Sequence, residues 1–134
     1  MKYILHQVNC MGVMGAGFAL QIRQAHPDVY TKYKQLCNKY KPEQLLGHAF
    51  VVDNIISVFG QLKYGRDKTI VYTNYNALEK AFKSIDEKLP EGDIVIPYGL
   101  GCGLGNGNWE IVNDIIIKSF KKHKVIISKN IKIN

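Results

Sequence analysis

The sequence lacks the features that would place it in a membrane or direct it out of the cell. Among its 134 residues there is no apolar run near the roughly 18 residues that a membrane-spanning helix needs. Its start has neither the apolar core nor the small-residue cleavage site of a secretory leader. We therefore expect a cytoplasmic protein, built as a single domain over residues 1–134.

Cysteine is scarce and irregularly placed. The three cysteines, Cys10, Cys37 and Cys102, are odd in number and none has Cys-x-x-Cys spacing, which argues against a disulfide framework and a zinc ribbon. A metal site built from His6, Cys10 and Cys102 has no recognisable ligand spacing either. We expect reduced thiols and no bound metal, with a thiol nucleophile only a minor alternative to simple packing.

The usual phosphate-binding fingerprints are missing as well. Neither of the two glycine-rich stretches has the Gly-x-Gly-x-x-Gly spacing of a dinucleotide-binding loop, and neither is followed by the Gly-Lys-Ser/Thr of a P-loop. The first stretch nevertheless follows a mostly apolar run, Tyr3 to Val8, begins after Asn9 and contains Gly12, Gly15 and Gly17. A strand that leads through such a loop into a helix directs backbone N–H groups and a positive helix end at one point. We expect that point to receive a phosphate.

A second glycine cluster repeats this arrangement. It follows the short apolar run Ile94 to Ile96 and has glycine at every second position from Gly99 to Gly107. Ligands of open α/β sheets bind at the carboxyl ends of neighbouring strands, so the two loops together are expected to hold a diphosphate. Taken singly, each loop is equally consistent with a tight turn or a close-packing device.

Hydrophobic periodicity predicts strands and helices in the order β-α-α-β-β-β-α-β-α-β. The strands are expected at residues 3–8, 49–52, 55–59, 69–72, 94–96 and 125–128. Asp53 and Asn54 are expected to turn a hairpin, Pro27 to separate two successive helices, and Asn108 to cap the last helix. The predicted fold is a three-layer α/β/α sandwich around a central mixed sheet of about six strands. The polar segment 60–68 is either a plain connection or a flap over a ligand.

The charge balance is basic but dispersed. Eighteen lysines and arginines against 11 acidic residues give a net charge of +7, which attracts anionic ligands or nucleic acid. Outside the tail from Lys118 to Lys132, the cations do not form one stripe interleaved with aromatic residues. A solvated surface that weakly attracts phosphate-bearing small molecules is therefore favoured over a nucleic-acid interface.

Around the two glycine loops the sequence resembles the macrodomain family. The resemblance is carried by the stretch HQVNCMGVMGAGFA from His6 to Ala19, by GCGL from Gly101 to Leu104, and by Trp109, and it covers nearly the whole chain. It is most similar to the branch of ADP-ribose 1″-phosphate phosphatases with phage-encoded members, and to terminal ADP-ribose hydrolases that share the Met-Gly-Ala-Gly turn. The resemblance implies binding of ADP-ribose in a cleft across the top of the sheet, with no metal or organic cofactor. We expect a monomer.

The resemblance also implies roles for individual residues. Asn9 would orient the distal ribose, and His6 matches a histidine that is a suspected catalytic group in the phosphatase branch. An imidazole can protonate a leaving ribose oxygen or accept a phosphoryl group near neutral pH; the alternative is a core histidine satisfied by a neighbouring backbone group. Backbone groups of both loops would cradle the diphosphate, namely those of Gly15, Ala16, Gly17, Gly101, Cys102, Gly103, Leu104 and Gly105.

Departures from the family pattern accompany these matches. The chain begins too late to include the family's usual first strand, whose Asp reads adenine, so the means of adenine recognition is left open. Gly105 stands where the branch that removes ADP-ribose from acidic side chains has an Asp. Neither Lys63 nor Lys68 aligns clearly with the Lys that acts with that Asp. Arg66 is a candidate clamp for a terminal phosphate or an ordinary surface residue.

These observations lead to one principal hypothesis and several alternatives. The principal hypothesis is an enzyme that hydrolyses ADP-ribose 1″-phosphate to ADP-ribose and phosphate. The alternatives are a non-catalytic ADP-ribose reader, a hydrolase that removes ADP-ribose from modified macromolecules and, less favoured, a nucleic-acid-binding module.

Near the predicted loops, Tyr64, Tyr75 or Tyr98 could stack on a base, although core packing is the commoner role of an aromatic ring.

Overall fold

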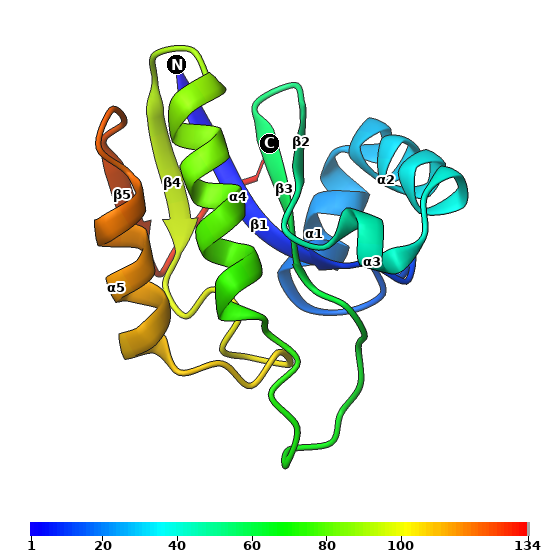
Figure 1. Ribbon diagram of the computed structural model, residues 1–134. Coiled ribbons are helices and arrows are strands. Elements are labelled where there is room, and N and C mark those ends of the chain that lie inside the picture. The colour runs from blue at the N-terminus through cyan, green and yellow to red at the C-terminus, as the bar shows by residue number, and fades with distance from the viewer. Residues whose placement is uncertain (134) are drawn as a thin grey trace.

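The computed structural model describes residues 1–133 and contains one central sheet with helices on both faces (Figure 1). The strands are β1 (Lys2–Asn9), β2 (Ala49–Val52), β3 (Ile55–Gln61), β4 (Asp93–Pro97) and β5 (Val125–Ser128). The helices are α1 (Gly17–Ala25), α2 (Pro27–Lys39), α3 (Pro42–Leu45), α4 (Tyr75–Lys88) and α5 (Trp109–Ser119). The three-layer arrangement predicted from the sequence is confirmed.

The sheet topology brings the ends of four strands to one edge. The strand order is β2-β3-β1-β4-β5, and β1, β3, β4 and β5 run parallel while β2 is antiparallel to β3. The carboxyl ends of the parallel strands therefore share one edge, which is the lower edge in Figure 1. Both glycine loops and the long connection from β3 to α4 gather there (Figure 1).

Side chains of β1 point alternately to two apolar clusters, as the period of a strand requires. Tyr3 and Leu5 join the cluster under α4 and α5, whereas Ile4 and Val8 join the cluster under α1, α2 and α3. Because both faces of the sheet are covered, every residue of β1 after Lys2 is buried or partly buried. This burial holds the strand that leads into the first glycine loop.

Several local predictions are confirmed. α1 ends at Ala25 and α2 begins at Pro27, with His26 between them. The hairpin turns at Asp53 and Asn54, where Asp53 takes a left-handed φ of 55°. The Asn108 side chain caps α5 by accepting from the N–H groups of Glu110 and Ile111.

The prediction of about six strands was wrong by one, because residues 69–72 do not form a strand and the sheet has five. Both edges of β3 are already paired, with β2 on one side and β1 on the other, so this run has no free strand beside it. The N–H groups of Tyr72 and Thr73 donate instead to the carbonyl oxygen of Gly105. Ile70 and Val71 are exposed.

The chain after β5 crosses behind the sheet instead of adding an edge strand (Figure 1). Ile131 and Ile133 are half-buried and pack against the cluster that contains Ile4 and Ile55. Within the 133 residues described, no helix has the length and hydropathy to cross a membrane.

Candidate ligand-binding cleft

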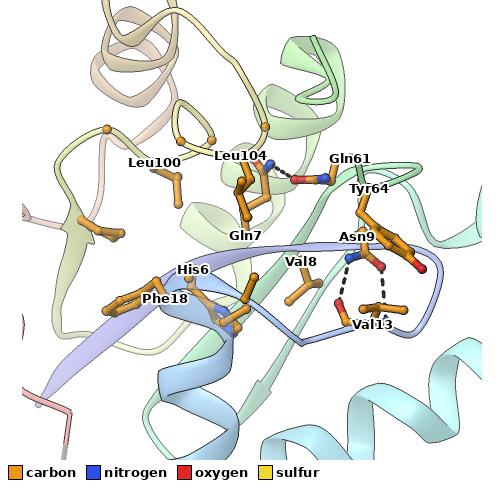
Figure 2. A pocket seen from close by; sticks show the side chains of 18 of the residues that line it. His6, Gln7, Val8, Asn9, Val13, Phe18, Gln61, Tyr64, Leu100 and Leu104 are labelled. Atoms are coloured by element: carbon orange, nitrogen blue, oxygen red, sulfur yellow. Dashed lines mark hydrogen bonds between the residues drawn. The ribbon is translucent and has the colours of Figure 1, made fainter. Parts of the chain in front are cut away.

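A cleft of about 590 Å³ lies at the carboxyl ends of the parallel strands (Figure 2). Its walls are the first glycine loop with the start of α1, the second glycine loop, and part of the connection after β3. In Figure 2, His6 and Phe18 lie on one side of the view and Asn9, Val13 and Tyr64 on the other. The structure thus brings the two predicted loops together around one space large enough for a small ligand.

Asn9 shapes the first loop from within. Its side-chain oxygen accepts from the N–H groups of Met11 and Val13, at 3.0 and 3.4 Å, and its Nδ2 donates to the Val13 carbonyl at 2.8 Å (Figure 2). Asn9 also lines the cleft, although only 8% of it is exposed. Its role toward a ribose stays a prediction, and its contacts show that it also fixes the loop.

Tyr33 of α2 completes this arrangement and was not identified from the sequence. Its hydroxyl oxygen lies 2.6 Å from the Asn9 carbonyl oxygen and 2.8 Å from Asn9 Oδ1, so its proton can be donated to either. The same hydroxyl accepts from the Gly12 N–H at 3.1 Å. In the sequence Tyr33 is one member of the apolar stripe of a helix, and only the fold brings it under the loop.

The N-terminus of α1 faces the cleft without a side-chain cap. Ala16 is the N-cap residue and supplies no acceptor, whereas Asn74 caps α4 and Asn108 caps α5. Gly17 and Phe18, in the first turn of α1, line the cleft. Free N–H groups and the positive end of the helix dipole therefore meet at a point where an anion could be bound.

The glycines of the loops fall into two groups. A Cβ at Gly105 would overlap the Thr73 hydroxyl and the Gly101 carbonyl, so packing requires glycine there. Gly103 has an ordinary φ and no atom within 4 Å of the position of a Cβ, and Gly15 would meet only Val13, at 3.7 Å. Neither backbone conformation nor packing explains glycine at 15 and 103, and both positions line the cleft. Glycine there leaves room for a ligand to approach the backbone.

A side-chain network supports the second loop. Gln7 Nε2 donates to Gln61 Oε1 at 2.7 Å and to Thr73 Oγ1 at 3.0 Å, and Thr73 Oγ1 donates to the Gly101 carbonyl at 2.6 Å. Gln7 is thus one of the polar residues of β1 for a structural reason. Its polar character in a mostly buried strand was the signal in the sequence that pointed to it.

His6 is buried beneath the cleft and uncharged. It is 1% exposed, its Nε2 lies 2.6 Å from the Ser57 hydroxyl oxygen, and its ring is edge-on to Phe18. Burial lowers the pKa of His6 to about 3, so the imidazole is neutral near pH 7. Its polar partner is a side chain of the neighbouring strand and not a backbone group. The catalytic role of His6 stays a prediction.

The thiols beside the cleft are protonated. Burial raises the pKa of the Cys10 thiol to about 12 and also raises the pKa of Cys102. The Cys102 thiol donates to the Leu100 carbonyl at 3.3 Å. A protonated thiol is a poor nucleophile, which favours packing for both. Within residues 1–133, no three His, Cys, Asp or Glu side chains cluster as a metal site would require.

The connection after β3 borders the cleft, which favours a flap over a plain linker. Tyr64, Gly65 and Arg66 line the cleft, whereas Lys63 and Lys68 are not among the described residues that do. Across the cleft, Tyr98 is 52% exposed. The Tyr98 ring lies 5.0 Å from the Trp109 ring between centroids. Tyr75 does not stack in the cleft: its hydroxyl accepts from the Asn108 N–H.

Solved structures share this architecture. The macrodomain of Mycobacterium tuberculosis DarG superimposes with a TM-score of 0.76 at 24% identity, over 93% of this chain and 86% of that one. This chain has the macrodomain fold. A protein of unknown function from Bacteroides thetaiotaomicron superimposes on this chain with a TM-score of 0.82 at 26% identity, over 94% of this chain and 85% of that one. A structure of Thermosipho africanus DarTG in complex with ADP-ribose matches with a TM-score of 0.75 at 23% identity, over 95% of this chain and 37% of that one.

Sequence comparison also finds relatives of this chain. The DNA ADP-ribosyl glycohydrolase of Mycobacterium tuberculosis is 27% identical over 127 residues, which cover 89% of this chain and 35% of that protein. The chain thus spans about a third of the length of this relative. An uncharacterized 17.5 kDa protein of Enterobacteria phage T4 is 27% identical over 94% of this chain and 84% of its own length. No protein-family model matches the sequence.

Proposed function

We propose that this macrodomain binds ADP-ribose in the cleft and hydrolyses the bond between C1″ of the distal ribose and a substituent. The observation that carries the proposal is the pair Gly15 and Gly103, which face the cleft from opposite loops and whose missing side chains the fold does not require. A diphosphate lying between the loops would occupy that room and accept from backbone N–H groups. The uncapped start of α1 adds a positive end at the same place.

The relatives support ADP-ribose as the ligand. The Mycobacterium tuberculosis relative is named a DNA ADP-ribosyl glycohydrolase, and the Thermosipho africanus structure is in complex with ADP-ribose. Both likenesses extend over at least 89% of this chain. We therefore place removal of ADP-ribose from a nucleic acid first among the hydrolytic reactions.

The second candidate reaction is hydrolysis of ADP-ribose 1″-phosphate. Arg66 favours it, because this residue lines the cleft and a guanidinium suits a phosphate group. In the first reaction the oxygen of water forms a bond to C1″ and the bond from C1″ to the nucleic acid breaks. In the second it forms a bond to phosphorus and the bond from phosphorus to the C1″ oxygen breaks. In both, the proton of water ends on the leaving group. The loop N–H groups would hold the diphosphate in place while this occurs. This binding step depends on backbone groups and does not involve the His6 imidazole.

The binding test is calorimetric titration with ADP-ribose of the wild type and of Gly103→Ala. The added methyl group meets no protein atom, so the free energy of unfolding should stay unchanged or rise by about 0.4–1 kcal/mol, because the unfolded chain loses freedom. The affinity should fall by about tenfold or more, a loss of roughly 1.4 kcal/mol. Undiminished affinity in a folded variant would contradict ligand contact at this loop.

The reaction test follows release of ADP-ribose by mass spectrometry. The wild type is incubated separately with an ADP-ribosylated oligonucleotide and with ADP-ribose 1″-phosphate. Release of ADP-ribose from only one of the two substrates would show whether the leaving group is the nucleic acid or phosphate. Binding without release from either would identify a reader, and strongly salt-dependent oligonucleotide binding without any response to ADP-ribose would identify a nucleic-acid-binding module.

A further inference from the structure

A third segment, outside both glycine loops, brings a charged residue to the cleft. We call residues 62–72, between β3 and the start of α4, the strap; it contains no helix or strand. Tyr64, Gly65 and Arg66 of the strap line the cleft. Of the cleft-lining residues within the described chain, Arg66 alone carries a formal charge at neutral pH.

The strap is anchored to the first loop at its beginning. The Cys10 N–H lies 3.1 Å from the Gln61 carbonyl and 3.2 Å from the Leu62 carbonyl, and Gln61 Nε2 donates to the Lys63 carbonyl at 2.8 Å. Asn9 pairs in register with Gln61 across β1 and β3. The beginning of the strap is therefore beside Asn9, and Figure 2 shows Tyr64 on the same side of the view as Asn9.

The strap is anchored to the second loop at its other end. Asn106 Nδ2 lies 3.0 Å from the Asp67 carbonyl and 2.8 Å from the Ile70 carbonyl. The Tyr72 N–H donates to the Gly105 carbonyl, and a Cβ at Gly65 would overlap the Tyr72 hydroxyl. The backbone on both sides of Arg66 is thus fixed, while the side chain itself is exposed.

The guanidinium of Arg66 is available for a ligand. Within the described chain it makes no ion pair and no hydrogen bond. Its neighbour Asp67 makes no ion pair with it; the Asp67 carboxylate accepts instead from both the N–H and the hydroxyl of Thr69. Hydrogen bonds from Thr69 lower the pKa of Asp67. A fixed backbone, an unpaired guanidinium and a place in the cleft lining two residues after Tyr64, which lies on the Asn9 side, are the features of an anion-recognition residue.

We propose that Arg66 is a specificity-determining residue that binds a phosphate of the substrate outside ADP-ribose itself, on the leaving-group side of the cleft. The proposal rests on the proposed function, in which the diphosphate of ADP-ribose lies between the glycine loops and the distal ribose near Asn9. The phosphate recognised by Arg66 has two possible sources, the 1″-phosphate of ADP-ribose 1″-phosphate and the backbone of an ADP-ribosylated nucleic acid. Both present oxygens that a guanidinium binds through two parallel hydrogen bonds.

The test compares three probes on Arg66→Ala: ADP-ribose, ADP-ribose 1″-phosphate and an ADP-ribosylated oligonucleotide, with Kd or KM measured for each. Loss of a charge-assisted contact should weaken binding of at least one of the two probes that carry a phosphate outside ADP-ribose by about tenfold or more, and binding of ADP-ribose by less than about threefold. The probe that weakens identifies the source of the phosphate. Arg66→Lys, which keeps the charge without the planar fork, should recover part of the loss.

Lys68→Ala is the matched control, because it removes the same charge from the same strap at a residue that does not line the cleft. It should leave all three probes unchanged. An equal loss for ADP-ribose and for the other probes in Arg66→Ala would overturn the proposal, since Arg66 would then hold the diphosphate. Undiminished binding of all three probes would also overturn the proposal for Arg66, but it would leave the proposed function standing. A wild type that does not bind ADP-ribose would overturn both proposals.

Discussion

At the scale of single residues, the first glycine loop depends on polar contacts that are made below its surface. One hydroxyl group, that of Tyr33, joins α2 to the carbonyl of Asn9, the side chain of Asn9 and the N–H of Gly12. The ring is fully buried and stacks on Phe59. The ring packs in the core while the hydroxyl orders the loop, so the two contributions can be separated by removing one atom.

Tyr33→Phe should lower the free energy of unfolding by about 1–3 kcal/mol, because buried groups of Asn9 and Gly12 lose a partner. Urea denaturation measures this loss. Affinity for ADP-ribose should fall as well, since the loop is no longer fixed. Asn74→Ala, which removes a helix cap away from this loop, is the control for general destabilisation: it should cost about 1 kcal/mol without the same loss of affinity.

His6 should make the protein sensitive to acid. Burial lowers the pKa of His6 from 6.5 to about 3, so below pH 6.5 the unfolded chain takes up a proton that the folded protein does not. The stability that depends on a neutral His6 is therefore fully present above about pH 6.5. It is lost as the pH falls toward 3, by at most about 1.4 kcal/mol per pH unit.

Denaturation of the wild type and of His6→Gln between these pH values measures the effect. The variant lacks the titrating group, so its stability should fall less steeply than that of the wild type as the pH decreases. Parallel curves for the two proteins would show that the imidazole is not held neutral in the fold.

What could be predicted for single residues follows from their separation in the chain. His6, Asn9 and the first glycines lie in one continuous stretch, so local pattern was enough to select them. Tyr33 reaches Asn9 across 24 residues and Thr73 reaches Gly101 across 28. Such partners depend on how helices and strands pack, and no spacing rule in the sequence encodes them.

At the scale of elements, the strap is the segment whose conformation the sequence described least well. Its apolar residues suggested a strand at 69–72, but the neighbouring strand positions were already filled. The strap is held by Asn106 instead, which has a left-handed φ of 58° and donates to two strap carbonyls. The hairpin, the break at Pro27 and the cap at Asn108 were predictable because each depends on the chemistry of adjacent residues.

Asn106→Gly tests this anchoring, because glycine accepts the left-handed backbone and removes only the side-chain hydrogen bonds. Amides of residues 67–72 should exchange with deuterium faster, while those of α4 should be unchanged. Mass spectrometry of the corresponding peptides measures both. Unaltered exchange in the strap would show that its contacts with Gly105 are sufficient.

At the scale of the whole molecule, the last residues close one face of the sheet. The helices α1, α2 and α3 cover the side of β2 and β3, and the segment after β5 brings Ile131 and Ile133 to the same cluster (Figure 1). In the sequence this tail was distinguished only by its lysines. The alternation of isoleucine with polar residues was the signal for a covered face.

Replacing Ile131 and Ile133 together by serine should therefore lower the free energy of unfolding by about 1–3 kcal/mol, since both side chains are only partly buried. Urea denaturation measures the change, and Lys132→Ser, between them, should have little effect. The cleft lies at the carboxyl ends of the strands, away from this contact, so ADP-ribose affinity at low temperature should be retained. Equal stability of the double variant and the wild type would mean that the tail does not cover the core in solution.

The ring pair on the far wall of the cleft gives this protein a built-in optical probe. Trp109 is the one tryptophan of the chain, and its ring lies 5.0 Å from that of Tyr98, which borders the cleft. A nucleotide that settles beside Tyr98 changes the surroundings of a single indole. Tryptophan emission would then follow occupancy directly, without a label, and this emission would come from one known place in the molecule.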